Sequence, residues 1–438
     1  MLAIGLFACN KILDVDPTAS IPAEDAINTA TGVERALAGS YNALQATGLY
    51  GRNLLVIGDL AADNLTWTGT TLEYGQIENK PVPAENAVID GFWSASYDGI
   101  NRVNNVLYYL PGIEYQDITL KQVAEGEALF IRALLYFNLV QYFGPVPYRE
   151  LPTIDVSSVD APRTEVMTIY NRLLSDLKKA KGQLPASREK GRASKASAMA
   201  LEAKIYLNMF YKTQNTAYAD SSITSASYVI DSTGSSLEPN FQNLFGPKGY
   251  SAESIFEISF DIQNYTRLAQ YFYTRDSSGR YEFAPTTGLV SLLNDDTIRL
   301  KASIRHDKNN NPFGIKYFDV AGGADRVYVF RLAEMYLLRA EALAYSSTDT
   351  VQIKKDLNII RARVLLPEIT TNSMDTLKIA IDIENRAEFA FEGHRWNDLV
   401  RTGRAAQVLG IDPKYTLFPI PLSEMSTNKL IGSQNEGY

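Results

Sequence analysis

The chain has 438 residues, of which 45% are apolar and 21% are charged, and its formal net charge at pH 7 is −8. A chain of this length and composition buries about three quarters of its unfolded surface and forms one large domain or two. The negative charge argues against nucleic acid as a partner, because phosphate binding needs a basic surface. Only 2 His occur beside 26 Tyr and 18 Phe, which leaves little room for a metal centre or for histidine-based acid–base catalysis.

The chain begins with an apolar run over residues 2–8 that ends at Cys9, the only cysteine. A lone cysteine is a buried apolar residue, a reactive thiol or the attachment point of a covalent group. The run is too short for a membrane-spanning helix, which needs about 20 residues. Residues 6–9 read Leu-Phe-Ala-Cys, the form of a bacterial lipobox, so we predict a signal segment over 1–9 and a lipid on Cys9. No basic residue precedes Lys11, and we expect the start codon to lie further upstream.

Three segments of different character follow. Residues 10–25 carry two prolines and no helical period, which predicts an extended tether. From residue 26 to residue 44, apolar residues recur at four-residue steps and predict a helix. Residues 48–91 lose this period and are rich in Gly, Asn and Thr. They are predicted to be irregular loops, where recognition residues are commonly found.

Helical spacing of apolar residues then returns and predicts further helices. The predicted helical segments are 93–112, 125–147, 164–185, 194–212, 326–346 and 351–364. The second is apolar on almost every side and is expected in the core. Three of the segments mix small alanine with large apolar residues around a central Arg or Lys, a composition typical of closely stacked helical hairpins such as tetratricopeptide arrays. The predicted fold class is therefore mainly α, a tetratricopeptide-like scaffold of helical hairpins.

The region from residue 213 to residue 324 differs from these helices. It is heavy in Ser, Asn, Tyr and Gly and holds short alternating pieces such as SIFEISF. We predict irregular loops and a few short strands inserted into the scaffold.

The C-terminal stretch IENRAEFAFEGHRWNDLVRTGRA, followed by LFPIPLSEMSTNKLIGSQNEGY, resembles the SusD/RagB family of outer-membrane nutrient-binding lipoproteins. The likeness continues upstream in YDGINRVNNVL, EALFIRALLYFNLVQYFGPVP and RLAEMYLLRAEAL, and so covers nearly the whole chain. It implies a single SusD-like domain over 26–438 and supports the lipid on Cys9, which would anchor the protein to the outer membrane at the cell surface. It also implies a non-catalytic protein without a cofactor that captures oligosaccharides and passes them to a SusC-like TonB-dependent transporter.

Ligand-binding residues are expected in the loop-rich regions. Trp67 lies in GDLAADNLTWTGTTLEYG, where no periodicity requires burial. Sugars present C–H faces that stack on flat aromatic rings, and hydroxyl groups that pair with polar side chains. We therefore predict ligand contacts from Asp63, Asn64, Trp67 and Tyr74. Local packing is the alternative for each aromatic residue.

A second aromatic cluster occurs in NYTRLAQYFYTRDSSGRYEF. Tyr271 and Tyr273 alternate along the chain, so they would share one face of a strand and form a second stacking platform. Local packing is again the alternative. By contrast, Trp93 and Trp396 fall in motifs of the resembling family that sit on helices, and both are expected in the core.

Other functions remain open at this stage. A RagB-like member of the family would bind a peptide instead of a sugar. A secreted glycoside hydrolase would need two carboxylates about 5 to 10 Å apart in a cleft, and the 50 Asp and Glu residues leave that option open. A helical-repeat scaffold that binds only protein would lack an exposed aromatic pair. No metal site is expected, because Pro312 stands in DKNNNPFG where a calcium-binding loop of the EF-hand type needs Gly.

Overall fold

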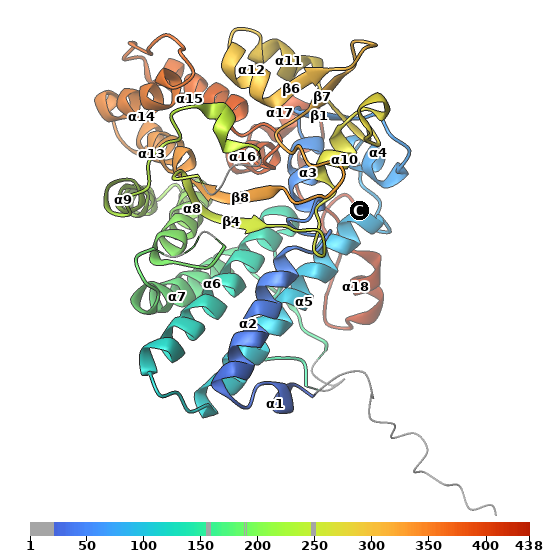
Figure 1. Ribbon diagram of the computed structural model, residues 1–438, viewed down its shortest axis with the longest axis vertical. Helices are drawn as coiled ribbons and strands as arrows, with labels where there is room; N and C mark the ends of the chain where they lie inside the picture. The colour runs from blue at the N-terminus through green and yellow to red at the C-terminus, as the bar shows by residue number, and fades with distance from the viewer. Residues whose placement is uncertain (1–21, 155–158, 188, 190, 247–250) are drawn as a thin grey trace, which may run out of the picture.

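The computed structural model describes residues 22–154, 159–187, 189, 191–246 and 251–438 (Figure 1). Cys9 and its predicted lipid lie outside these residues. Helices make up most of the molecule, and the strands are short and paired two by two. The mainly helical fold class predicted from the sequence is confirmed.

The elements run in chain order as follows. The helices of the first half are α1 (Ala23–Ala26), α2 (Ala30–Leu44), α3 (Asn53–Leu60), α4 (Leu72–Glu78), α5 (Ala87–Tyr109), α6 (Ile118–Phe143), α7 (Val166–Gln183), α8 (Lys195–Thr213) and α9 (Thr216–Ser232). The later helices are α10 (Leu268–Phe272), α11 (Thr287–Leu293), α12 (Thr297–Ser303), α13 (Leu332–Ser346), α14 (Thr350–Ala362), α15 (Met374–Glu388), α16 (Arg395–Arg401), α17 (Ala405–Leu409) and α18 (Leu422–Thr427). The strands are β1 (Leu65–Trp67), β2 (Val146–Pro147), β3 (Arg163–Thr164), β4 (Ser254–Ser259), β5 (Phe283–Pro285), β6 (Ile304–His306), β7 (Pro312–Gly314) and β8 (Arg326–Arg331).

Consecutive long helices pack side by side and build an array (Figure 1). Helix α2 packs on α5, α5 on α6, α6 on α7, α7 on α8 and α8 on α9. The array continues with α9 on α13, and α13 packs on both α14 and α15. Gln214 and Asn215 alone join α8 to α9, so these two helices form a tight hairpin. This stacking of neighbours is the hairpin scaffold that the mixture of alanine and large apolar residues predicts.

Capping side chains fix where several of these helices begin. The backbone N–H of Gly32 donates to Oγ1 of Thr29 at 3.1 Å, just before α2. Ser194 and Ser197 form a reciprocal capping box at the start of α8. Such acceptors satisfy N–H groups that the first turn of a helix leaves without partners.

Helix α6 forms the centre of the hydrophobic core. Every apolar side chain from Leu129 to Phe143 is buried, which confirms the prediction made from its all-round hydrophobicity. It is surrounded by α2, α5, α7 and α8, which all contact it. Among the helices of the described residues, none is long and apolar enough to cross a membrane.

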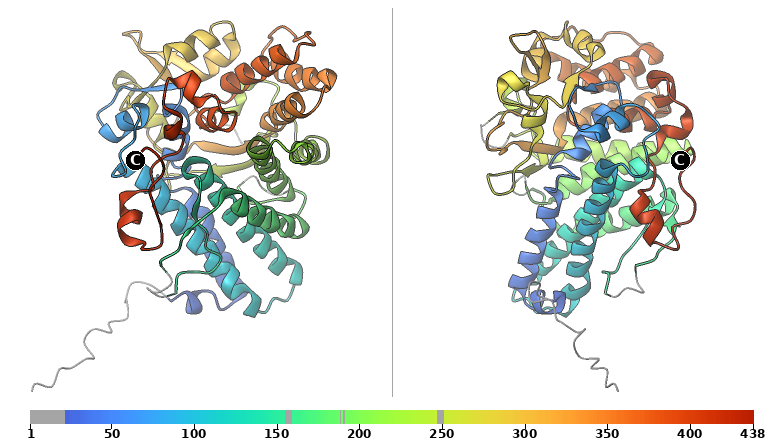
Figure 2. Two further views of the ribbon diagram at one scale, coloured as in Figure 1. Left: turned by 180° about the vertical axis from the view of Figure 1, so that it is seen from behind. Right: turned by 90° about the vertical axis from the view of Figure 1, so that its right-hand side faces the viewer.

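Two insertions interrupt the array and meet on one side of the molecule. The first, residues 45–86, carries α3, β1 and α4, and the second, residues 233–331, carries β4 to β8 and α10 to α12. Strand β1 pairs antiparallel with β5, so that Trp67 stands opposite Phe283. Figures 1 and 2 show α3 and α4 of the blue first insertion beside α10 of the yellow second one, whereas β4 of the second insertion lies against α8 of the array. The β1–β5 strand pair therefore joins two segments that are far apart in the sequence.

Several boundaries differ from the sequence predictions. Residues 48–91, predicted to be irregular loops, hold the short helices α3 and α4 and the start of α5. Most of the tether predicted over 10–25 lies outside the described residues, and its end is helical because α1 begins at Ala23. The helix predicted over 26–44 is interrupted at residues 27–29, between α1 and α2. Residues 326–331 form β8 instead of the start of a helix, because their alternating Val, Tyr and Phe side chains suit a strand that pairs with β4. The region 213–324 opens with helix α9 rather than with loops.

Candidate functional site

Three carboxylates of segment 384–398, here called the C-terminal motif, belong to a largely buried ion-pair network. Arg331, which is 1% exposed, stands at its centre. Its guanidinium nitrogens lie 2.9 Å from Glu253, 2.5 Å from Glu388 and 2.8 Å from Glu392. The C-terminal motif thus contributes two of the three carboxylates that hold this arginine.

A second buried arginine, Arg299, extends the network. Its guanidinium nitrogens lie 2.6 Å from Asp296, 2.5 Å from Glu384 and 2.7 Å from Glu388. The cations of the network are Arg299, Lys316, Arg331, Arg361 and Arg363, and its carboxylates are Glu253, Asp296, Glu384, Glu388 and Glu392. The two charges balance, which is the condition for burying ionised groups without an uncompensated charge.

The pKa of Glu388 shows how the network acts. Burial alone would raise this pKa, but Arg363, Arg299 and Arg331 outweigh burial and hold it well below its ordinary value. Glu388 is therefore ionised and fully engaged by its neighbours. The network links α12, α14, α15 and β8, and its role is structural.

The predicted ligand residues Asp63 and Asn64 face this same motif. The Asp63 carboxylate lies 2.7 Å from Nε of Arg395 and 3.2 Å from Nη1 of Arg386. Asn64 is 1% exposed, donates to Asp59 at 2.6 Å and accepts from Nε of Arg386 at 2.9 Å. The burial of Asn64 leaves it no surface for a ligand, which corrects the prediction of a direct contact from this residue. The Asp63 side chain is 24% exposed, and a ligand contact from it stays a prediction.

Tyr74 and Tyr271 pack into a buried aromatic core. They are 1% and 7% exposed, and their ring centroids lie 4.7 Å and 6.1 Å from that of Phe283. Because Phe283 stands opposite Trp67 in the β1–β5 pair, the structure does bring the two predicted clusters together. However, it brings them together as a packed core, so Tyr74 and Tyr271 have no free ring face for a ligand.

Trp67 and Tyr273 keep part of their surface. A Cβ on Gly75 would lie 2.6 Å from Cε3 of Trp67, so α4 covers part of the indole. The indole Nε1 is buried and has no hydrogen-bond partner among the residues described. Tyr273 follows the short helix α10 instead of lying on a strand, and its ring packs on Phe313 at 5.0 Å. It therefore does not share a stacking face with Tyr271.

The surface next to this aromatic core carries exposed groups outside the predicted set. Tyr265 is 47% exposed and Leu72 is 67% exposed. The guanidinium carbon of Arg267 lies 4.5 Å from the ring centroid of Tyr265. The alternation of Arg and Tyr in NYTRLAQYFYTRDSSGRYEF is the sequence signal that could have indicated these residues.

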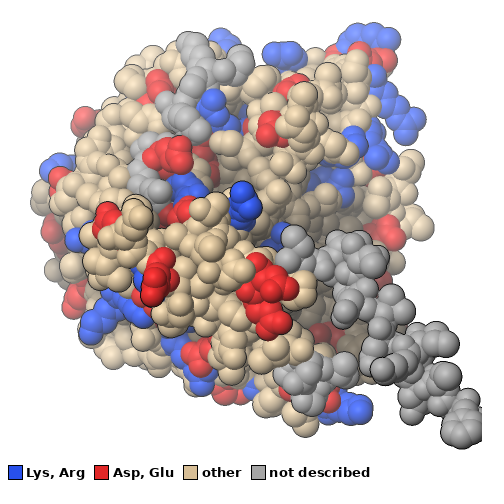
Figure 3. Space-filling model, turned by 60° about the horizontal axis from the view of Figure 1, so that its bottom comes forward, with Lys and Arg blue, Asp and Glu red and all other residues tan. Residues whose placement is uncertain are grey.

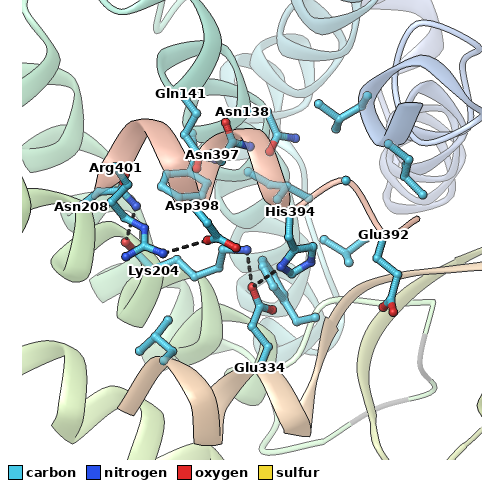
Figure 4. Close-up of a pocket in the computed structure, with 18 of the residues that line it drawn as sticks. Asn138, Gln141, Lys204, Asn208, Glu334, Glu392, His394, Asn397, Asp398 and Arg401 are labelled. Atoms are coloured by element: carbon cyan, nitrogen blue, oxygen red, sulfur yellow. Dashed lines mark hydrogen bonds and ion pairs between the residues drawn. The ribbon is translucent and has the colours of Figure 1, made fainter. Parts of the chain in front are cut away.

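A polar pocket of about 90 Å³ lies between α6, α8, α13 and α16 (Figure 4). This volume holds several water molecules, whereas pockets that enclose organic ligands start at about 300 Å³. Lys204 is hydrogen-bonded to Glu334, and Nδ1 of His394 lies 3.7 Å from the same carboxylate. Arg401 donates to Asp398 at 2.8 Å. The pocket therefore lies at the contact between the helical array and the C-terminal motif. It is too small for a sugar chain.

The ionisable groups of this pocket are either neutral or paired with a group of opposite charge. Burial, followed by the neighbouring Lys204, lowers the pKa of His394 well below its ordinary value, so its imidazole is neutral. Burial raises the pKa of Glu334 and of Asp398, and each carboxyl has a Lys or Arg partner. A glycoside hydrolase needs two carboxyls on either side of a bound sugar, and this pocket offers no room for that sugar.

The DKNNNPFG stretch forms a polar turn between β6 and β7. The Asp307 carboxylate accepts from the backbone N–H groups of Asn309 and Asn311 at 2.9 Å and 2.8 Å. Across the described ranges of the chain, no three His, Cys, Asp or Glu residues are grouped so that they could hold a metal ion.

Comparison with known proteins agrees with this arrangement of scaffold and motif. Residues 11–207 match a family described as SusD-like, starch-binding and associating with the outer membrane, and residues 316–414 match the SusD family. The chain belongs to the SusD/RagB family. SusD-like protein P2 of Formosa agariphila is 25% identical to this chain in an alignment of 513 residues with gaps included. The alignment covers 100% of this chain and 98% of that protein.

Two further relatives carry informative descriptions. The starch-binding protein SusD of Bacteroides thetaiotaomicron is 26% identical over 73% of both chains. Surface glycan-binding protein A of the same species, solved in complex with laminarihexaose, has the same fold: its TM-score is 0.81 at 20% identity, and the match covers 93% of this chain and 100% of that one.

The residues that carry the likeness to the SusD/RagB family serve the fold. Glu384, Glu388 and Glu392 belong to the buried ion-pair network. Trp396 is 0% exposed and stacks on Phe418 with a centroid distance of 5.5 Å, which confirms its predicted place in the core. The family motif therefore identifies the scaffold, and the ligand face must be sought elsewhere.

Proposed function

We propose that this protein is a non-catalytic cell-surface lipoprotein that binds oligosaccharides and delivers them to a SusC-like TonB-dependent transporter of the outer membrane. The observation that carries the proposal is membership of the SusD/RagB family over both the helical array and the C-terminal motif. The match to a family described as starch-binding and the fold shared with a laminarihexaose-bound protein support it. Moderate affinity would suffice, because release to the transporter must follow capture.

The proposed ligand face lies where the two insertions meet at the β1–β5 pair. Trp67 and Tyr273 are partly exposed there, and Tyr265 is 47% exposed. Their flat rings offer stacking surfaces for the C–H faces of a sugar. The buried Tyr74 and Tyr271 support this face from below through their contacts with Phe283.

Titration calorimetry of the purified protein against laminarihexaose, maltohexaose and other neutral and acidic oligosaccharides tests the proposal. We expect binding to at least one glycan, and a loss of about tenfold or more in affinity in Trp67→Ala, because truncation of a stacking aromatic costs about 2 kcal/mol or more. Trp67→Phe keeps a flat ring and the packing against Gly75, so it should retain part of the affinity.

Tyr108→Ala is the matched control. Tyr108 is 47% exposed but lies on α5, outside the two insertions, so its loss should leave glycan affinity unchanged. Binding of peptides in place of every glycan would contradict the proposal and favour the RagB-like alternative. Release of a chromophore from a chromogenic glycan by the purified protein would instead show that it is an enzyme.

A further inference from the structure

Three arginines surround two tyrosines beside the proposed ligand face. The guanidinium carbons of Arg52 and Arg280 lie 4.0 Å and 4.8 Å from the ring centroid of Tyr271. Arg267 lies in the same way over Tyr265, at 4.5 Å. The two cations at Tyr271 are thus separated by less than the Debye length of about 10 Å at 0.1 M salt, so they repel each other in the absence of an anion.

Hydrogen bonds between the two insertions hold these arginines on one stretch of surface. The Thr266 hydroxyl donates to the carbonyl of Gly51, which places the residues before α3 next to the residues before α10. Gln270 contacts both Arg267 and Arg280. Its side-chain oxygen accepts from Nη1 of Arg267 at 2.8 Å, and its backbone carbonyl accepts from the backbone N–H of Arg280 at 2.7 Å. The cluster is therefore built by the fold and does not depend on one loop.

The charges of this cluster have no acidic counterpart. Arg267 and Arg280 are exposed, Arg52 is partly exposed, and within the described ranges none of the three is ion-paired to an Asp or Glu. The buried arginines of the described residues are held by carboxylates, as Arg331 and Arg299 show. An unpaired cationic cluster stands out on a chain whose net charge is −8.

Of the carboxylates near this cluster, Asp276 is ion-paired to Lys308 at 3.3 Å, and three others are engaged by backbone N–H groups. Asp261 accepts from the N–H of Asn264 at 2.7 Å, and Glu282 accepts from the N–H of Thr71 at 3.1 Å. Asp319 accepts from backbone N–H groups of its own turn. These contacts hold the acids in turns, and among the described residues none of these carboxylates forms an ion pair with Arg52, Arg267 or Arg280.

We propose that this arginine–tyrosine surface binds acidic groups of the captured glycan, so that the ligand is an anionic oligosaccharide carrying uronate carboxylates or sulfate esters. Guanidinium groups match the planar oxygens of carboxylates and sulfates with paired hydrogen bonds, and the exposed ring of Tyr265 can stack on the adjoining sugar. The assignment rests on the proposed function, since it names the class of glycan that the same face would take.

Calorimetric titration of the full chain against matched pairs of oligosaccharides tests this inference. One arm uses a uronic-acid hexasaccharide and its carboxyl-reduced form, and the other uses a sulfated hexasaccharide and its desulfated form. We expect an acidic member to bind at least tenfold more tightly than its neutral counterpart, and to lose affinity as NaCl rises from about 0.05 to about 0.5 M. The arm that binds identifies the acidic group.

Substitutions of the arginines complete the test. Arg267→Gln and Arg280→Gln should each weaken acidic-glycan binding by about tenfold or more, because each removes a charge-assisted hydrogen bond. Arg275→Gln is the matched control, because Arg275 is exposed on the same segment, is likewise without an ion pair among the described residues and is not stacked on a tyrosine. It should change affinity by less than about threefold.

Two results would overturn the inference in distinguishable ways. If the neutral counterparts bind as tightly as the acidic glycans, or if Arg267→Gln and Arg280→Gln bind the acidic glycan like the wild type, the anionic class is wrong while glycan capture stands. If no glycan binds at all, or if only an acidic peptide does, the proposed function fails together with the inference. Thermal melts that match the wild type ensure that a loss of binding reports on the surface.

Discussion

Single side chains of this protein divide into those that hold the fold and those that face solvent, and residue type alone does not decide which. Trp93 and Trp396 are 2% and 0% exposed, as the helical family motifs around them predict. Tyr74 lies seven residues after Trp67 in a stretch without helical spacing, and yet it is also buried. At the residue scale, burial follows from periodicity where a helix exists and from distant partners where it does not.

The core role of Trp396 gives a test at this scale. Trp396→Ala should lower the free energy of unfolding by roughly 3 to 5 kcal/mol, because the lost ring leaves a cavity beside Phe418. Urea denaturation measures this change. The exposed Tyr108→Ala should change the same quantity by less than about 0.5 kcal/mol. If Trp396→Ala unfolds at the urea concentration of the wild type, its ring is not part of the core.

At the scale of elements, the fold depends on close contacts between segments that are distant in the sequence. Helix α3 and the turn before α16 meet at two glycines: a Cβ on Gly58 would lie 2.1 Å from the carbonyl oxygen of Gly393. Gly393 also has φ of +80°, in the left-handed region that favours glycine. This approach lets its N–H donate to the buried Asp59 carboxylate at 2.8 Å.

The burial of Asp59 makes this contact sensitive to pH. Burial raises the pKa of Asp59 to about 7. The hydrogen bonds from Asn64 and Gly393 lower this pKa, but by less than burial raises it. The unfolded chain loses this proton near pH 4, whereas the folded chain keeps it until about pH 7. Because the folded state binds the proton more tightly, the titration of Asp59 lowers the unfolding free energy as pH rises from 4 to 7. Above pH 7 this loss of unfolding free energy stays constant.

Asp59→Asn removes this titration. The unfolding free energy of the variant minus that of the wild type should increase by roughly 2 to 4 kcal/mol as the pH rises from 4 to 7.5, because only the wild type loses stability through Asp59. The measurement is urea denaturation of both proteins across this range. The difference between them isolates Asp59 from other titrating groups, such as His394, whose contribution is common to both. Parallel stability curves would mean that Asp59 is ionised in the folded protein throughout.

At the scale of the whole molecule, buried contacts tie the helical array, the C-terminal motif and the second insertion together. Helices α2, α5, α6, α7 and α8 share one core with Phe391 and Trp396 of the C-terminal motif. The buried ion-pair network ties α14 and this motif to Arg299 and Arg331 of the second insertion, and the two insertions meet on one side of the array (Figure 2). On the face drawn in Figure 3, acidic and basic side chains lie intermixed among broad uncharged areas. The proposed ligand face lies on the side where the two insertions meet.

The predicted lipid anchor is also a property of the whole molecule. Cys9→Ser in the expressing cell should move the protein from the membrane fraction to the soluble fraction, because the acyl chains that hold it would be missing. Fractionation followed by immunoblotting measures the distribution. An unchanged membrane fraction for Cys9→Ser would show that something other than a lipid on this residue retains the protein.

The sequence by itself determined the helical class, the buried α6, the core positions of Trp93 and Trp396, and the family. These features depend on local spacing and on motifs that are continuous in the chain. Only the tertiary structure decided the candidate site. Tyr74 is buried because Phe283 and Tyr271 come from the second insertion, and Asn64 is engaged because α15 brings Arg386 to it. The exposed arginine cluster likewise depends on contacts between two insertions, which local pattern does not encode.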